Sequence, residues 1–399
     1  MNFKDLLKRK KIPEDSSEAS VSRALSSKSA KKIDFSFLSR LDFKSLLSGK
    51  KQLVGLDIGS HSLKLVEIID GANGVSTMTR FVEAPLEKGI IVDGTIADLG
   101  QLVDAVKGLF KQAGLQGRGV VTSLSGHSVI VKKATFPFME EQELREAIRD
   151  EAGKYLPFDS MDEVNFDFQV LGQNEYNPNQ IDVIIVAAKK DIVEAYVEAI
   201  EMAGLSAVIL DVDSFALETM YERNYDYEEQ DIAVIVNIGA SITNINVVKN
   251  ATSIFTRDFT MGCNAIAEAI SEQYGVPPEE AQRILVEGPE GDEAVRDDFN
   301  YRLLMLADPI LSEIERSVDY FRSTYGDEDI KQIILAGGGA SLPGIANDLG
   351  HCLGVPAEVV NPFQKIGWSK KHMDTDELER IGPIAAVAVG LALRRVGDK

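Results

Sequence analysis

The segment from Leu53 to Ile68 reads LVGLDIGSHSLKLVEI, and the rest of the chain is organised around it. Two apolar runs flank a polar turn, which is the pattern of a β-hairpin. The turn offers backbone N–H groups and small hydroxyls to an anion, and its glycine allows close approach. An ordinary hairpin with a polar turn is the alternative for this segment alone. The candidate binding residues here are Asp57, Gly59, Ser60, His61, Ser62 and Lys64.

A second segment, Ile232 to Val248, repeats the pattern as IAVIVNIGASITNINVV. Both segments contain an apolar run, Asp or Asn, Ile-Gly, a small residue, a hydroxyl residue and another apolar run. Two such hairpins in one chain predict a duplicated domain with a ligand clamped between the copies. The candidate residues of the second turn are Asn237, Gly239, Ala240, Ser241 and Thr243.

A third motif, IKQIILAGGGASL from Ile330 to Leu342, predicts a strand followed by a glycine-rich turn. Glycines leave the backbone uncovered, so a flat adenosine has room to pack on this turn. Three adjacent glycines alone are weak evidence, but three motifs in this order make a strong joint signal. The candidate residues are Gly337, Gly338, Gly339, Ser341 and Leu342.

The residue types of the first turn suit a nucleotide. Lys64 can place a positive charge on phosphate oxygens, and Asp57 can hold the water shell of a magnesium ion. Between the motifs the sequence alternates strands and helices. Apolar spacing predicts a helix over 97–113 that ends at Gly114, and a long helix over 308–325.

Length and composition place the chain among cytoplasmic globular proteins. Its 399 residues suffice for two domains. With only two cysteines, the sequence argues against a disulfide framework, and neither cysteine belongs to a motif with metal-ligand spacing. No apolar run reaches the length of a membrane span, and no secretory signal is recognisable.

Charge is distributed unevenly along the chain. Residues 1–51 hold 13 lysines and arginines against 6 acidic residues, a net charge of +7. Because the whole chain carries −21, the remainder carries −28, which argues against nucleic-acid binding. The basic arm contains near copies of one phrase, NFKDLL (2–7) and DFKSLL (42–47). These copies suit a partner groove or an acidic membrane surface, and a weakly constrained tail is the alternative.

The order of the motifs DIGSHSLK, NIGASIT and LAGGGASLPG resembles that of the actin-like ATPase superfamily. In that superfamily two α/β halves close on Mg-ATP, so the resemblance implies an α/β chain with two duplicated domains around a nucleotide cleft. It spans residues 53–395 and includes GPIAAVAVG (382–390), which matches the interdomain helix. Small residues let helices approach closely, which suits a hinge.

Within the superfamily the chain is similar to the PilM family of type IV pilus assembly proteins and to its relative FtsA. TRDFTMG (256–262) and VNPF (360–363) are similar to PilM phrases. PilM and FtsA carry an extra small α/β subdomain near 119–190. The expected organisation is a basic arm over 1–51, a first domain over 52–225 with that subdomain inserted at about 119–190, and a second domain over 226–395.

The resemblance implies ATP and magnesium as ligands, with Asp57 and Asn237 reaching the metal through water. Glu280, Gln282 and Arg283 follow Pro277-Pro278 on a predicted helix that, by resemblance, faces the ribose, with simple exposure as the alternative. Many hydrolysing relatives have Asp where this chain has Asn237, and an uncharged amide organises a metal less strongly. No catalytic residue is assigned, and weak or no hydrolysis is expected.

The expected function is an ATP-binding scaffold of type IV pilus assembly, peripheral to the inner membrane. By resemblance its partner is the cytoplasmic tail of a PilN-like membrane protein, docked beside the extra subdomain. The pilus motor ATPase, self-association and membrane-surface contact by residues 1–51 are further expectations. An FtsA-like division protein and a sugar kinase of the same superfamily are the alternatives. A division protein would carry its basic membrane segment at the C-terminus, and a kinase would need a carboxylate beside a sugar pocket.

Overall fold

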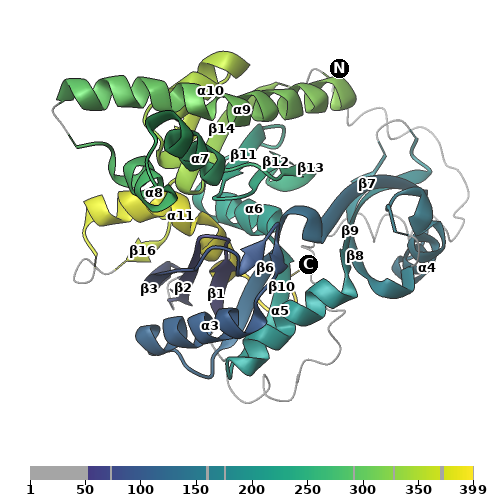
Figure 1. Ribbon diagram of the computed structural model, residues 1–399. Coiled ribbons are helices and arrows are strands. Elements are labelled where there is room, and N and C mark those ends of the chain that lie inside the picture. The colour runs from purple at the N-terminus through teal and green to yellow at the C-terminus, as the bar shows by residue number, and fades with distance from the viewer. Residues whose placement is uncertain are drawn as a thin grey trace, which may run out of the picture.

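The computed structural model describes residues 53–71, 74–158, 161–174, 177–290, 293–326, 329–368 and 373–398. The predictions for the basic arm, residues 1–51, therefore lie outside the described residues. Two mixed sheets, each covered by helices, form the body of the molecule, and a smaller sheet stands to one side (Figure 1). No helix in the described part of the chain is long and apolar enough to cross a membrane.

The first sheet contains the hairpin predicted at Leu53–Ile68. Its strand order is β10-β6-β1-β2-β3-β16, with β1, β2 and β3 antiparallel and β6 and β10 parallel to β1. β1 is buried along its whole length, as its apolar run predicts. The strands are β1 (Leu53–Ile58), β2 (Ser62–Asp70), β3 (Ser76–Pro85), β6 (Gly119–Leu124), β10 (Ser206–Val212) and β16 (Gly367–Trp368).

The second sheet repeats this arrangement. Its order, β13-β12-β11-β14-β15, is again an antiparallel three-strand meander followed by two parallel strands. The duplication expected from the two hairpins is therefore present in the topology. The strands are β11 (Ile232–Ile238), β12 (Thr243–Lys249), β13 (Thr252–Phe259), β14 (Ile330–Ala336) and β15 (Ala357–Val359).

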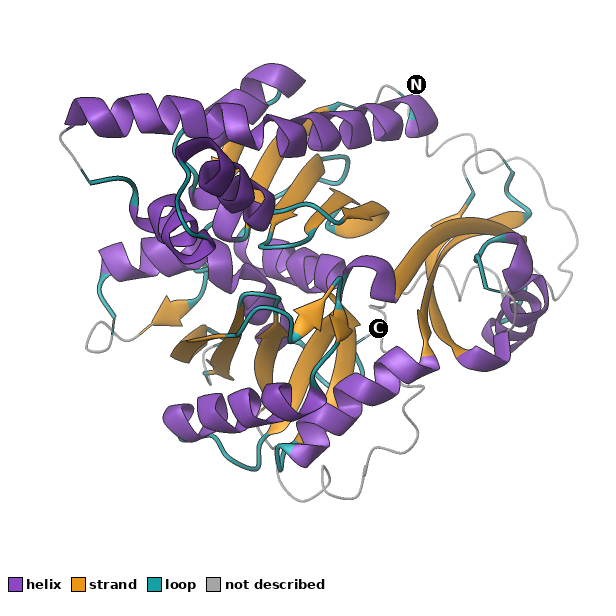
Figure 2. Ribbon diagram, viewed as in Figure 1, coloured by secondary structure: helices purple, strands orange, loops and turns teal. Residues whose placement is uncertain are grey.

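Helices cover the outer faces of both sheets (Figure 2). α3 (Leu99–Ala113) and α5 (Lys190–Met202) pack on the first sheet through a core that includes Leu102, Phe110 and Tyr196. α3 ends at Gly114 with a left-handed backbone, as predicted. The second sheet packs against α7 (Cys263–Tyr274), α9 (Glu293–Tyr325) and α10 (Ile345–Leu353).

Two helices lie between the sheets and join the domains. α6 (Asp213–Asn224) and α11 (Thr375–Leu393) share one core with residues of both sheets. They cross at small residues: a Cβ added at Gly390 would lie 1.8 Å from the Ala216 carbonyl oxygen. The backbones are in direct contact there, which is the close approach expected of a small-residue helix at a hinge.

The extra subdomain is a three-stranded sheet, β7-β9-β8, packed on the charged helix α4 (Glu141–Glu151). Its strands are β7 (Val129–Pro137), β8 (Val164–Gln173) and β9 (Gln180–Lys189). The predicted range of 119–190 includes β6, which belongs to the first sheet, so that range begins one strand too early. The chain also returns to the first sheet at β16, beyond the boundary expected at 225–226.

The remaining elements are short, except α8 (Pro278–Glu287), which begins at a proline as predicted. They are β4 (Ile91–Val92), β5 (Thr95–Ile96) and the 3-10 turns η2 (Gly126–Ser128), η3 (Ala152–Lys154), η4 (Met161–Glu163) and η5 (Gly338–Ser341).

One helix prediction is wrong in its start. α9 begins at Glu293 and passes through Pro309, whereas the sequence favours a start at Asp308 because proline suits a first helical turn. Phe299, Leu303 and Ala307 are buried in the core of the second domain. Their packing continues the helix toward the N-terminus despite the proline.

Candidate functional site: a cleft between two matching turns

The first turn places opposite charges side by side. Asp57 and Lys64 are cross-strand partners at the end of the β1–β2 hairpin, and Lys64 Nζ lies 3.2 Å from Asp57 Oδ2. Between them the Gly59 N–H donates to the Ser62 carbonyl oxygen at 3.2 Å. A Cβ added at Gly59 would lie 3.1 Å from Lys64 Nζ, so the ammonium rests against the glycine of the turn. A phosphate here would meet both this cation and the backbone.

The second turn has the same register. Asn237 pairs with Asn244, and the Gly239 N–H donates to the Ile242 carbonyl oxygen at 3.0 Å. Asn237 Nδ2 donates to Asn244 Oδ1 at 2.9 Å, where the first turn has its ion pair. The two hairpins therefore share one backbone conformation and differ in their side chains.

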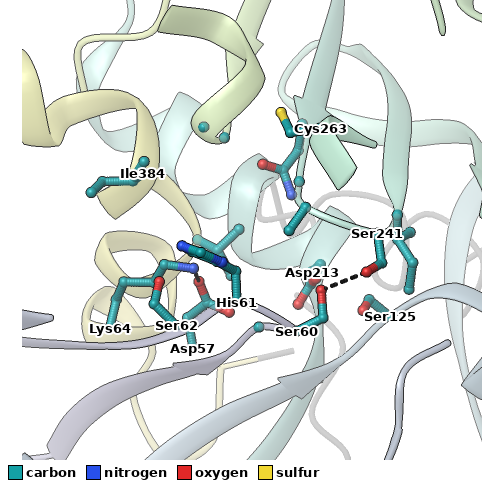
Figure 3. Close-up of a pocket in the computed structure, with 18 of the residues that line it drawn as sticks. Asp57, Ser60, His61, Ser62, Lys64, Ser125, Asp213, Ser241, Cys263 and Ile384 are labelled. Carbon is teal, nitrogen blue, oxygen red and sulfur yellow. Dashed lines mark hydrogen bonds and ion pairs between the residues drawn. The ribbon is translucent and has the colours of Figure 1, made fainter. Parts of the chain in front are cut away.

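The two turns meet across the cleft. Ser60 Oγ donates to Ser241 Oγ at 3.0 Å (Figure 3). Asn264 Nδ2, from the start of α7, donates to the same oxygen at 3.0 Å. Together the turns line one end of a cavity of about 420 Å³ between the domains. The lining includes nearly all the predicted turn residues: Asp57, Gly59, Ser60, His61, Ser62, Lys64, Asn237, Gly239, Ala240 and Ser241.

The other end of the cavity has the predicted adenosine loop on one side. Gly337, Gly338, Ser341 and Leu342 line it, and a Cβ added at Gly338 would meet no atom within 4 Å. Gly337 has φ of +81°, and a Cβ there would lie 2.4 Å from the Ile238 carbonyl oxygen. Position 337 therefore requires glycine so that the loop can lie on the second hairpin. Apolar side chains from α8 and α11 complete this end: Leu285, Val286, Ile384 and Val387.

Four predicted residues do not line the cavity. Thr243 is buried and donates to the Met261 carbonyl oxygen at 2.7 Å. Gly339 is buried against Ile238. Glu280 and Arg283 pair with each other on α8 at 3.7 Å, while Gln282 alone of the three predicted helix residues lines the cavity. For Glu280 and Arg283 the alternative of simple exposure describes this structure.

Asp213 lines the cavity and was not predicted. It begins α6 directly after β10, is half-buried, and accepts a hydrogen bond from Ser123 Oγ at 2.5 Å. Burial and the nearby Asp57 carboxylate raise the pKa of Asp213 to about 8. The available signal was its place after the buried strand VILDV, because strand ends in open α/β sheets border ligand crevices.

Other lining residues also escaped sequence reasoning. Asn244 follows Asn237 by the spacing that separates Lys64 from Asp57, so the internal repeat contained the signal. Glu83 on β3 stands opposite Lys64 and accepts from Ser62 Oγ at 2.8 Å. The missed lining residues include Glu83, Ser125, Asp213, Asn244, Cys263 and Arg380. Burial raises the pKa of the Cys263 thiol to about 12, so this cysteine remains protonated.

The residues present fit a magnesium nucleotide. The phosphate end combines one ammonium group, two glycine turns and hydroxyls, while the opposite end is open at Gly338 and apolar. Asn244 Nδ2 is buried and has no hydrogen-bond partner among the described residues. Because Asn244 lines the cavity, a ligand bound there could accept a hydrogen bond from this unpaired N–H group.

The comparison with protein families identifies the family of this chain. The model described as "Type IV pilus assembly protein PilM" matches residues 55–396. The chain belongs to the PilM family. A solved structure titled "PilM-PilN type IV pilus biogenesis complex" has a TM-score of 0.74 and 29% identity, over 87% of this chain and 99% of that chain. The match covers both turns, the adenosine loop and the subdomain.

More distant structures share the fold with this PilM family member. The ethanolamine utilization protein EutJ from Carboxydothermus hydrogenoformans has a TM-score of 0.50 and 16% identity, over 85% of this chain and 88% of that chain. A diol dehydratase-reactivating factor in nucleotide-free form has a TM-score of 0.50 and 10% identity, over 86% and 99%. The fold is that of the actin-like ATPases, as expected.

Proposed function

We propose that this PilM family member binds ATP with magnesium in the interdomain cavity and works as a nucleotide-dependent scaffold in type IV pilus assembly. The observation that carries the proposal is the pair of turns with identical register, joined by the Ser60–Ser241 hydrogen bond at the cavity. A ligand bound there contacts both domains at once. Its binding energy therefore favours one relative position of the domains.

The residues have separable tasks in this proposal. Lys64 and the backbone N–H groups of the two turns hold the phosphates, while Asp57 and Asn237 orient water around magnesium. Gly337 and Gly338 carry the adenosine against the apolar side chains of α8 and α11. The bound magnesium would neutralise phosphate charge.

Weak turnover follows from the same geometry. Asn237 adds no negative charge for the metal. Binding is therefore better supported than hydrolysis, and the chain acts as a switch set by nucleotide occupancy.

The partner proposed for this scaffold is the cytoplasmic tail of a PilN-like membrane protein. Support comes from the similar chain in a structure titled as a PilM–PilN complex. The three-stranded subdomain contributes no residue to the predicted nucleotide motifs, and among the described residues its outer strand β8 pairs on one side only, with β9. Such an edge can accept an extended peptide through backbone hydrogen bonds. Docking there would hold the chain at the inner membrane.

Thermal unfolding with and without ATP–Mg tests the nucleotide site. A ligand at 100 times its Kd adds about 2.7 kcal/mol to folded-state stability, so the wild-type midpoint should rise clearly. Lys64→Ala should abolish most of that rise. Lys107→Ala, which alters an exposed lysine on α3, is the matched control and should behave like wild type. An undiminished rise in Lys64→Ala would contradict the assignment of this cavity.

A further inference from the structure

The 3-10 turn η2 (Gly126–Ser128) lies where the nucleotide cavity, the second domain and the extra subdomain meet. Ser125, just before it, lines the cavity. Val129, just after it, begins β7 and hence the three-stranded sheet. The chain thus passes from the cavity wall to the subdomain within a few residues.

On one side η2 contacts the second domain. The Gly126 N–H donates to Asp258 Oδ2 of β13 at 2.8 Å. Gly126 has φ of +63°, and a Cβ added to it would lie 2.6 Å from Cδ1 of Ile242, which belongs to the second turn. The second turn and β13 therefore both touch this one residue. A charge-assisted hydrogen bond is among the stronger contacts that can join two domains.

On the other side η2 is fixed to the first domain. Ser128 Oγ donates to the Gly94 carbonyl oxygen at 2.7 Å, and Tyr196 OH donates to the same oxygen at 3.0 Å. Gly94 lines the cavity and lies in the loop between β4 and β5. Ser128 and Tyr196 are buried. The turn is therefore held from both sides.

Beyond η2, β7 approaches the second domain again. A second cavity of about 220 Å³ lies between β7, β13 and the end of α9. Lys133 Nζ of β7 stands 5.6 Å from the centroid of the Tyr325 ring, and Phe255 and Tyr320 also line the cavity. One wall of this cavity belongs to the three-stranded subdomain and the other to the second domain. The shape of the cavity therefore depends on the position of the subdomain relative to the second domain.

We infer that η2 couples nucleotide occupancy to the position of the three-stranded subdomain. The inference rests on the proposed nucleotide site. When the second turn and β13 move relative to the first domain, their contacts through Ile242 and Asp258 displace Gly126. Because β7 begins directly after η2, the displacement of Gly126 also moves β7. Packed contacts of this kind have discrete arrangements rather than a continuous range. The cavity between β7, β13 and α9 then differs between the nucleotide-bound and nucleotide-free states.

Hydrogen exchange followed by mass spectrometry tests this coupling on the full chain. In wild type, ATP–Mg should slow exchange in both phosphate turns and also, by about tenfold, in peptides covering β7, the scale of ordinary coupling between sites. Asp258→Ala should keep the slowing in the turns and lose it in β7. Ser128→Ala, on the opposite side of η2, should weaken it in the same region. Thr252→Ala, on the same strand as Asp258, is the control and should match wild type.

The outcomes separate this inference from the proposed function. Slowing in the turns without any change in β7 of wild type would overturn the coupling and leave nucleotide binding intact. Equal slowing of β7 in wild type, Asp258→Ala and Ser128→Ala would also overturn it, because the contacts at η2 would then be irrelevant. No slowing in either turn would overturn the nucleotide site and the coupling together. If Asp258→Ala does not fold, the Ser128→Ala result decides the question.

Discussion

The two phosphate hairpins have the same backbone and different chemistry. Each has a cross-strand pair flanking a four-residue turn, with one glycine N–H closing the turn. In the first hairpin the pair is ionic, Asp57 with Lys64 at 3.2 Å. In the second it is a neutral amide pair, Asn237 with Asn244 at 2.9 Å. The comparison separates what the backbone contributes to a ligand site from what charge contributes.

Charge and neutrality give the hairpins different tasks. Lys64 can exchange part of its attraction to Asp57 for a phosphate, so the first hairpin responds electrostatically to the ligand. The amide pair carries no net charge, so it offers a ligand only dipoles, which the Asn237–Asn244 hydrogen bond orients. We therefore expect the first domain to provide most of the affinity, and the second to provide shape and closure.

Removing the charge from the first hairpin should have the largest effect. The double variant Asp57→Asn/Lys64→Asn gives it the amide pair of the second hairpin. Charge-assisted hydrogen bonds contribute about 1.5–3 kcal/mol each, so we expect the Kd for ATP–Mg to rise about 100-fold by calorimetry. A change below about threefold, with the fold intact by circular dichroism, would show that the turns bind through backbone alone.

The charge of the first hairpin also acts on Asp213. Its folded-state pKa of about 8 exceeds the ordinary value of 3.8, so the folded state retains a proton that the unfolded state loses. Stability should therefore fall as pH rises between about 4 and 8, by at most about 1.4 kcal/mol per pH unit. Asp213→Asn, which cannot ionise, should flatten this decline in urea unfolding series.

The companion variant Asp57→Asn separates charge from burial as the cause. It should lower the pKa of Asp213 and shift the decline to lower pH, because one of the three causes of the raised pKa is gone, while burial and the Asp258 carboxylate remain. An identical pH profile for wild type and Asp213→Asn would contradict the assignment of the proton to Asp213.

Adding charge to the second hairpin should have the smallest effect. Asn237→Asp offers magnesium a carboxylate where wild type offers an amide, so ATP–Mg should bind at least as tightly, by up to about tenfold. The gain should vanish when EDTA removes the metal, since the carboxylate then faces phosphate directly. Asn246→Asp is not a suitable control because Asn246 is buried. Asn250→Asp, in the turn just after β12, is the matched control. Brisk ATP hydrolysis by wild type would count against the switch.

The sequence predicted the parts of the site that depend on local pattern. The two hairpins, the glycine loop and the duplication follow from repeated short motifs, because turn chemistry and strand alternation are local properties. The predicted start of α9 was wrong because that prediction also used only local pattern. Proline has a strong local preference, whereas the burial of Phe299 and Leu303 that extends the helix is a tertiary effect.

Residues contributed by distant segments were missed because no motif marks them. Glu83 reaches the site because β3 pairs with β2, and Arg380 because α11 lies under the cavity. Conversely, Glu280 and Arg283 have the right position in the sequence but lie on the exposed side of α8, so Gln282 is the one predicted residue of this helix that lines the cavity. Helix rotation decides this, and packing on Ala281 fixes the rotation.

By itself the sequence determined that this protein has two matching turns and one glycine loop, because glycine positions and apolar alternation act over a few residues. Only the tertiary structure decided that Ser60 meets Ser241, that Asp213 lies beside Asp57, and that Gly126 joins Asp258. Those contacts join residues from different sheets and helices. Their distances depend on how α6 and α11 pack between the domains, which no local pattern in the chain specifies.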